Sequence, residues 1–232
     1  ARTENEKKIY DDINQWGSYS ELLKTLSADK NVTGDTLREL VILKSLYDEY
    51  YGSDFSRSAL IKILDSLILK TKITIHKEIG LQIKNKITRL QAGYEPPFFE
   101  LYDADSNLVK LSDLRGKYIY LNFCTSYSYT CINEYELLNR LYQKHKKYLT
   151  IVTISTDPHE NSFNDFKRKN DYNWIFLYYG HQPEIIKEYD IRAYPTYFLI
   201  GPDGKLIYSP AASPSENFET KLFEAMRARG DL

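Results

Sequence analysis

Residues 118–134 have the sequence YIYLNFCTSYSYTCINE, which predicts a strand, a turn and a helix in succession. Residues 118–123 are nearly all apolar, as in a strand that is buried on both faces. Polar residues at 125–130 then interrupt the apolar run, and apolar residues recur at helical spacing from Ile132 onward. Cys131 is therefore expected in the first turn of a helix that leaves a central strand. The unpaired N–H groups and the positive end of the helix dipole there favour a thiolate over a thiol.

This segment resembles the active-site segment of the thioredoxin superfamily, specifically that of the TlpA/ResA-type thiol-disulfide oxidoreductases in the redoxin (AhpC/TSA-like) branch. Those proteins have the pattern F-W-A-x-W-C-x-x-C-x-x-E. Phe123, Cys131 and Glu134 match its first residue, its second cysteine and its glutamate. Cys124 stands in the place of the first tryptophan, and Ser128 replaces the first cysteine, which attacks the substrate disulfide in the family. The resemblance therefore implies the fold more directly than the activity.

A second segment, IRAYPTYFLIGPDGKLIY at residues 191–208, resembles the part of the same family in which a cis-proline precedes a strand and lies against the cysteine helix. By position this proline is Pro195, with Tyr194 before it. A trans proline at the start of an edge strand is the alternative. The pattern matches in order from Cys131 to Gly204, which favours the cis bond, a feature that marks tight functional turns elsewhere.

The C-terminal part of the chain carries strand and helix signals in alternation, which predicts parallel strands joined by right-handed crossovers. The resemblance covers this part and implies a thioredoxin-like α/β fold, with a central mixed sheet flanked by helices. The expected strands are residues 98–103, 108–111, 118–123, 149–154, 174–179, 197–200 and 205–208. The expected helices are residues 131–147, 161–169, 184–189 and 217–227.

The N-terminal part shows no strand alternation and carries several helix signals, which predicts an all-α region. Ser18 with Glu21 and Thr36 with Glu39 have the spacing of capping boxes. Ser56 is a candidate N-cap for a third helix, and a fourth helix follows it.

Gly93, Pro96 and Pro97 mark the boundary between these parts, because glycine and proline interrupt regular structure. We therefore expect two regions, a helical one at residues 1–93 and a thioredoxin-like domain at residues 94–232.

The chain has 232 residues, 42% of them hydrophobic, and a formal net charge of -1. This composition is typical of a soluble globular protein without a nucleic-acid partner. No apolar run reaches the length of a membrane span, so membrane association is expected only through an anchor outside this chain. Two cysteines are too few for a disulfide scaffold or a zinc site, and the four histidines are scattered. We expect neither a metal nor a cofactor.

Ordinary dithiol turnover needs one cysteine that attacks a disulfide and a second that resolves the mixed disulfide. Ser128 cannot perform the attack, because a hydroxyl is not ionised near neutral pH. Three alternatives stay open. In the first, Cys131 acts as a single thiol, Ser128 donates a hydrogen bond to its thiolate, and Glu134 accepts the thiol proton. The structural alternative for Glu134 is a first-turn carboxylate that favours the helix dipole.

The segment from Ser128 to Cys131 also resembles the T-x-x-C arrangement of peroxiredoxins, which share the fold. A monothiol peroxidase is therefore a variant of the first alternative. In the second alternative, Cys124 replaces the missing cysteine and forms a reversible disulfide with Cys131. The plainer interpretation of Cys124 is a small, buried apolar residue.

The third alternative involves no redox chemistry. In relatives, the groove beside the cis-proline binds extended peptide, so Pro195 and Tyr194 would offer a peptide-binding surface here. Tyr127 and Tyr129 would complete its aromatic rim with Tyr194. In this case the chain would be a redox-inactive binding module.

The main hypothesis is a thiol-disulfide oxidoreductase-like protein with an atypical S-x-x-C site and altered or reduced redox activity through Cys131. Its partner would be a protein or peptide that carries a thiol or a disulfide. The resemblance implies a periplasmic or otherwise extracytoplasmic setting, with a lipid anchor on the full-length form as an open alternative.

Overall fold

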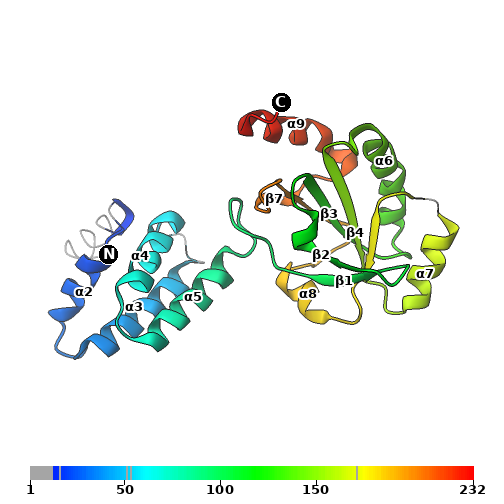
Figure 1. The fold of residues 1–232 in the computed structure, drawn as a ribbon. Coiled ribbons are helices and arrows are strands. Elements are labelled where there is room, and N and C mark those ends of the chain that lie inside the picture. Colours follow the sequence, from blue (N-terminus) through cyan, green and yellow to red (C-terminus); the bar gives the residue numbers. More distant parts are fainter. Residues whose placement is uncertain (1–12, 16, 51, 53, 171) are drawn as a thin grey trace. The chain divides into compact units, whose positions relative to one another are not determined.

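The computed structural model describes residues 13–232 with the exception of residues 16, 51, 53 and 171 (Figure 1). The chain divides into two compact units, the first ending at Thr88 and the second beginning at Arg89. The first unit is helical, and the second combines a seven-stranded sheet with helices. The predicted α/β fold class and the predicted helical N-terminal region are therefore confirmed.

Four helices with an apolar core between them account for most of the first unit. Ser18 accepts a hydrogen bond from the backbone N–H of Glu21 and so caps the first of these helices, as predicted. The predicted capping box of Thr36 and Glu39 is wrong, because the next helix already begins at Asp35 and Thr36 lies inside it. The helices are α2 (Tyr19–Ser27), α3 (Asp35–Tyr50), α4 (Arg57–Lys70) and α5 (Thr74–Thr88).

Glu39 is buried at the centre of a polar network in this unit, with 6% of its surface exposed. Its carboxylate accepts hydrogen bonds from the Tyr19 hydroxyl at 2.8 Å, from the Thr71 hydroxyl at 2.6 Å and from His76 Nδ1 at 2.7 Å. Burial alone would raise the pKa of Glu39, but the hydrogen bonds from Thr71, His76 and Tyr19 outweigh it and hold the pKa below its usual value. The carboxylate therefore joins segments from α2, α3 and α5.

The second unit is built on one mixed sheet with the strand order β2-β1-β5-β4-β3-β6-β7. Parallel pairing joins β3 to β4 and β4 to β5, whereas β6 is antiparallel to β3, and β1 is antiparallel to β5. The strands are β1 (Glu100–Asp103), β2 (Leu108–Lys110), β3 (Tyr118–Cys124), β4 (Leu149–Ser155), β5 (Ile175–Tyr178), β6 (Thr196–Ile200) and β7 (Leu206–Ala211).

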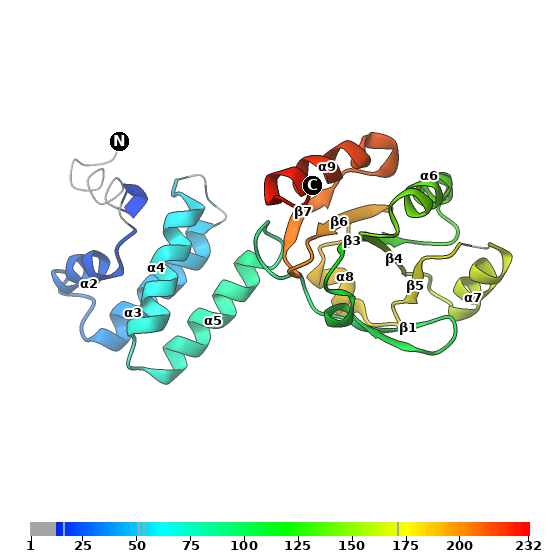
Figure 2. The same cartoon turned by 45° about the horizontal axis from the view of Figure 1, so that its top comes forward.

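Helices cover both faces of this sheet (Figure 2). Apolar side chains of α6, α7 and α9 pack on one face, and those of α8 pack on the other. The helices are α6 (Tyr129–His145), α7 (Glu160–Lys169), α8 (Pro183–Glu188) and α9 (Phe218–Arg229), with short 3-10 turns at η1 (Leu111–Leu114) and η2 (Pro214–Glu216). None of the described helices is long and apolar enough to cross a membrane.

Strand β3 is buried along its whole length, as the apolar run predicted. Its side chains alternate between the two cores, because successive residues of a strand point to opposite faces. Ile119, Leu121 and Phe123 join the core on the α8 side, whereas Tyr118, Tyr120 and Cys124 join the core on the α6 side. The last residue of β3 therefore faces the helix that follows it in the chain.

We predict that Glu39→Ala destabilises the helical unit by about 3 kcal/mol or more, because it leaves buried donors on Tyr19, Thr71 and His76 without an acceptor. Amide hydrogen exchange of the whole protein, followed on α4 peptides, measures this change in local opening free energy. Asp48→Ala is the control: it removes an exposed carboxylate from the same helix and is expected to cost less than about 0.5 kcal/mol.

The pH dependence of this unit follows from the same contacts. A carboxyl group whose pKa is lowered by folding stabilises the folded state above its unfolded-state pKa. That stabilisation is lost as the pH falls through the lower, folded-state pKa of Glu39. Equal protection of α4 amides in wild type and Glu39→Ala at pH 7 would contradict the assignment.

The domain boundary predicted near residue 93 can be tested with two fragments. Residues 89–94 contact the second unit, since Gly93 N–H donates to Leu206 O at 2.7 Å and Leu206 N–H donates to Tyr94 O at 2.9 Å. We expect fragment 89–232 to fold with the thermal midpoint of this unit in the whole chain. Fragment 95–232 lacks both hydrogen bonds and should melt at a lower temperature. Equal midpoints for the two fragments would contradict this expectation.

Candidate functional site

The candidate site lies where β3 turns into α6. Ser128 is the N-cap of α6: its hydroxyl oxygen accepts a hydrogen bond from the backbone N–H of Cys131 at 3.4 Å. Cys131 is the third residue of the helix, so its predicted place in the first turn is confirmed. A serine oxygen that satisfies one of the free N–H groups at a helix start is a sufficient local reason for the helix to begin here.

Both cysteines are free, and neither exposes any of its surface. Their side chains pack in the same core cluster, on the α6 side of the sheet. The alternation along β3 explains this contact, because Cys124 is directed toward α6 and Cys131 lies on the inner side of its first turn.

The pKa values of the two thiols are shifted in opposite directions. The hydrogen bond from Cys124 is the main cause that lowers the pKa of Cys131, and hydrogen bonds from Ser128 and from the Thr125 backbone act in the same direction against burial. Burial is the main cause that raises the pKa of Cys124 well above its ordinary value. Cys131 therefore ionises first, and Cys124 stays protonated as its hydrogen-bond donor.

Asp157 is a buried carboxylate beside the thiols that the sequence analysis did not identify. One of its oxygens accepts hydrogen bonds from the backbone N–H and the hydroxyl of Ser126, both at 2.9 Å. The other accepts from the Ser155 hydroxyl at 2.6 Å. Asp157 thereby fixes the turn between β3 and α6, and its negative charge raises the pKa of both cysteines. The available signal was an acidic residue two positions after the end of β4, the buried strand that pairs with β3.

Glu134 is directed to a different part of the unit. Its carboxylate accepts hydrogen bonds from the backbone N–H of Ser215, at 3.1 Å, and from the Ser215 hydroxyl. The expectation that Glu134 is a first-turn carboxylate is wrong, because α6 begins at Tyr129 and has no acidic residue in its first turn. Glu134 instead connects α6 to η2.

The segment before β6 lies beside the start of α6. The Thr130 hydroxyl donates a hydrogen bond to the backbone oxygen of Tyr194 at 3.3 Å. The bond between Tyr194 and Pro195 is cis. Tyr194 is half-buried, whereas Tyr127 and Tyr129 are 70% and 77% exposed. The structure therefore brings the proline segment to the cysteine helix and leaves two tyrosines exposed at the helix start.

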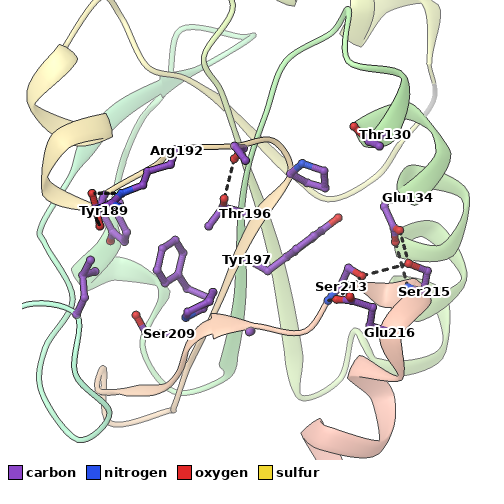
Figure 3. A pocket seen from close by; sticks show the side chains of 17 residues that line it. Thr130, Glu134, Tyr189, Arg192, Thr196, Tyr197, Ser209, Ser213, Ser215 and Glu216 are labelled. Atoms are coloured by element: carbon purple, nitrogen blue, oxygen red, sulfur yellow. Dashed lines mark hydrogen bonds and ion pairs between the residues drawn. The ribbon is translucent and has the colours of Figure 1, made fainter.

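A cavity of about 630 Å³ opens next to Pro195 (Figure 3). Its polar lining includes Thr130 and Glu134 from α6, and Tyr197 from β6. Cys131 is not among the lining residues. In Figure 3 the ring of Tyr197 extends from β6 toward α6, where Thr130 and Glu134 lie. The volume is in the range of sites for small ligands or short peptide segments.

Sequence patterns did not identify Tyr197 as part of the site. It lies in a predicted strand, where a tyrosine is expected to pack in the core. In the structure 2% of its surface is exposed. Among the residues that the structure describes, no group of three or more histidines, cysteines or acidic residues could hold a metal ion.

Comparisons with known proteins agree with this geometry. The profile of the AhpC/TSA family matches residues 92–209. "Thiol-disulfide oxidoreductase ResA" of Bacillus cereus (strain ATCC 10987 / NRS 248) is 32% identical over 125 residues, which are 53% of this chain and 71% of ResA. The ResA of Bacillus subtilis (strain 168) is 27% identical over 119 residues, 51% of this chain and 66% of that protein.

Solved structures show the same fold. The thioredoxin domain of a thiol-disulfide oxidoreductase from Bacteroides vulgatus matches with a TM-score of 0.54 and 23% identity, covering 59% of this chain and 99% of that one. A putative thiol:disulfide interchange protein DsbE from Chlorobium tepidum matches with a TM-score of 0.52 and 24% identity, over the same shares of the two chains. The family profile, the ResA relatives and the fold together show that this chain belongs to the AhpC/TSA family and is similar to its ResA-type thiol-disulfide oxidoreductases.

Proposed function

We propose that this chain is a thiol-disulfide oxidoreductase relative in which Cys131 is the reacting sulfur of an atypical S-x-x-C site, with altered or reduced redox activity. The observation that carries the proposal is the packing of two free, fully buried cysteines in one core cluster at the start of α6, where the pKa of Cys131 is lowered and that of Cys124 is raised. A thiolate is the nucleophile in thiol-disulfide exchange, so this difference selects Cys131 for the attack.

Ser128 takes the place of the cysteine that attacks the substrate in the family. Its oxygen forms no exchangeable bond to sulfur, and in this chain it caps α6. The site therefore lacks the exposed nucleophile, and turnover is slower than in relatives with two cysteines.

Cys124 supplies the second sulfur of the proposed cycle. The Cys131 thiolate attacks a substrate disulfide, forms a mixed disulfide and releases one substrate thiolate. Cys124 then loses its proton and attacks the Cys131 sulfur, which releases the second substrate thiolate and leaves a Cys124–Cys131 disulfide. The substrate gains two electrons and the cysteine pair loses two. Two thiols of a reducing partner protein return the pair to its reduced state by the reverse exchange and become a disulfide themselves.

This cycle requires the site to open, because both sulfurs are fully covered in the structure. We propose that the turn of residues 125–128, between β3 and α6, is the segment that opens. It is held by Asp157 through Ser126 and adjoins the Thr130–Tyr194 hydrogen bond. Slow opening of this turn is a second reason for reduced activity.

A peptide-binding module is the second candidate function. The cavity beside Pro195 and the exposed rings of Tyr127 and Tyr129 favour it, because concave sites with aromatic edges are typical of peptide recognition. In this candidate function the partner is still a protein or peptide, but no redox step takes place.

The setting of the protein is also a proposal. The ResA-type relatives support an extracytoplasmic location, where thiol-disulfide exchange with proteins takes place. The partner would be a protein or peptide with an accessible disulfide or thiol. The helical unit has no assigned part in this chemistry.

We predict that Ser128→Cys converts background turnover into measurable reduction of insulin disulfides, because it restores the attacking thiol at the helix start. Ser128→Ala is the matched variant without a thiol and should stay at background. Adding Cys131→Ala to Ser128→Cys should abolish the gain, since the mixed disulfide then has no neighbouring thiol at the second position. If Ser128→Cys is no more active than Ser128→Ala, Ser128 does not occupy the attacking position.

We predict that Cys124→Ala raises the pKa of Cys131, because it removes the main donor to the thiolate. Less thiolate is then present at neutral pH, and alkylation of Cys131 by iodoacetamide shifts to higher pH. Peptide mapping by mass spectrometry assigns the modified residue. Burial of the sulfur slows its reaction with iodoacetamide by the same factor at every pH. The midpoint of the pH profile therefore reports the pKa and not the accessibility of the sulfur.

Cys131→Ala provides the control for this experiment. Its remaining thiol, Cys124, should react only at strongly alkaline pH, because burial raises its pKa well above the ordinary value. The same alkylation midpoint for Cys131 in wild type and in Cys124→Ala would show that the two sulfurs are independent. That outcome would leave the peptide-binding module as the better account.

A further inference from the structure

Three buried side-chain polar atoms have no hydrogen-bond partner among the described residues: Asn122 Oδ1, Thr125 Oγ1 and the Tyr197 hydroxyl. All three gather at the end of β3. Asn122 faces the same side as Cys124 and lies opposite Tyr197 in the pairing of β3 with β6, and Thr125 directly follows Cys124. Buried polar groups are nearly always paired, because an unpaired one loses its bonds to water without replacement. A cluster of unpaired groups around two thiols therefore calls for a functional explanation.

Tyr197 is the most informative of the three. Its ring stacks on Tyr120 with 5.0 Å between centroids, and the Tyr120 hydroxyl donates to the backbone oxygen of Ala212 at 2.7 Å. The two stacked tyrosines thus differ in one respect: the hydroxyl of Tyr120 is paired and that of Tyr197 is not. The Tyr197 ring extends toward α6, the helix that begins beside Cys131 (Figure 3).

The Tyr197 hydroxyl remains protonated wherever a thiol can ionise. Burial is the main cause that raises the pKa of Tyr197 far above its usual range, and the nearby ionisable groups Cys124, Glu134 and Cys131 act in the same direction. The group is therefore a permanent O–H donor beside the thiol pair.

We propose that the Tyr197 hydroxyl donates a hydrogen bond to the Cys131 sulfur only when that sulfur is ionised. While Cys131 is a thiol, its sulfur is a weak acceptor and the Tyr197 hydroxyl stays unpaired. Once the proton leaves, the sulfur is an anion, and a hydrogen bond to an ionised group is about twice as strong as one between neutral groups. We expect the hydroxyl to pair with the sulfur only in this charged form. This inference rests on the proposed function, since it assigns Cys131 as the sulfur that ionises.

The other groups around Cys131 do not supply this donor. Cys124 and Ser128 already act on Cys131 by lowering its pKa, and the Ser128 hydroxyl also lies 2.9 Å from the Thr130 hydroxyl. Asp157 is an anion and opposes the thiolate. The remaining ionisable neighbours are Glu134, which accepts hydrogen bonds from Ser215, and Tyr194, which is only half-buried. Tyr197, with Thr125 as a second unpaired hydroxyl, is thus the uncommitted donor among these groups.

The test uses the whole reduced protein labelled with cysteine that is ¹³C-enriched at Cβ. Two cysteines give two resonances, which Cys124→Ala assigns, and their shifts report the thiolate-to-thiol ratio without a reagent having to reach the sulfur. We expect Tyr197→Phe to reduce this ratio at Cys131 about tenfold below the titration midpoint, because one donor to the charged form is lost. The thermal midpoint measured at the same pH should stay unchanged or rise, because the thiol state loses no hydrogen bond.

Tyr120→Phe is the matched control. It removes a paired hydroxyl from the partner ring, so it should lower the thermal midpoint and leave the ratio at Cys131 unchanged. Thr125→Val is a second variant, which should shift the ratio in the same direction as Tyr197→Phe. An unchanged ratio in Tyr197→Phe would overturn the proposal. A lowered thermal midpoint would also overturn it, because the hydroxyl would then have a partner in the thiol state.

The outcome is independent of turnover. The titration of Cys131 can be followed even if the protein reduces no disulfide, so a failed reductase assay does not affect it. Conversely, an unchanged ratio in Tyr197→Phe leaves the gain expected from Ser128→Cys untouched.

Discussion

Successive side chains of β3 point to opposite faces of the sheet, so Cys124 has to face the same helix as Tyr118 and Tyr120. That helix is α6, which starts five residues after β3 ends and carries Cys131 on its inner side. A shift of one residue in the strand would direct Cys124 to the opposite core and separate the sulfurs. This alternation determines the packing of the two thiols, the opposite shifts of their pKa values and the position of the unpaired hydroxyls.

The site combines features that stabilise a thiolate with features that oppose it. Donors from Cys124, Ser128 and the Thr125 backbone favour the charged sulfur, whereas burial and Asp157 disfavour it. Ser128 contributes to both structure and acidity, since its oxygen caps α6 and its side chain lowers the pKa of Cys131. The balance leaves the pKa of Cys131 below its ordinary value although the side chain is fully buried.

Sequence patterns were sufficient for the elements that have strong local signals. The apolar run of β3, the start of α6 near Ser128 and the helical N-terminal region could all be predicted from periodicity and capping residues. Thr36 was wrongly predicted to be an N-cap because threonine is common at that position. In the structure Asp35, the residue before it, already belongs to α3. The buried role of Glu39 depends on partners 20 to 37 residues away, which no local pattern contains.

The same limit applies to the candidate site. Cys131 and Pro195 were identifiable from two motifs, but the direction of Glu134 depends on Ser215, which is 81 residues away. Asp157 and Tyr197 each occupy a position with an ordinary local explanation, a strand end and a core tyrosine. Their importance comes from the register of β3 with β4 and β6, which places them around the thiols. Only tertiary structure provides that information.

The hydrogen bonds that hold the turn before α6 have a kinetic consequence. Chemistry at a sulfur with no exposed surface proceeds through a short-lived open state, so the observed rate is the intrinsic rate multiplied by the fraction of molecules that are open. Asp157 and the Thr130–Tyr194 hydrogen bond hold the residues on either side of the start of α6, so we expect them to lower that fraction. The acidified thiol is therefore shielded from reagents while the turn is closed, and a partner that displaces the turn would trigger its reaction.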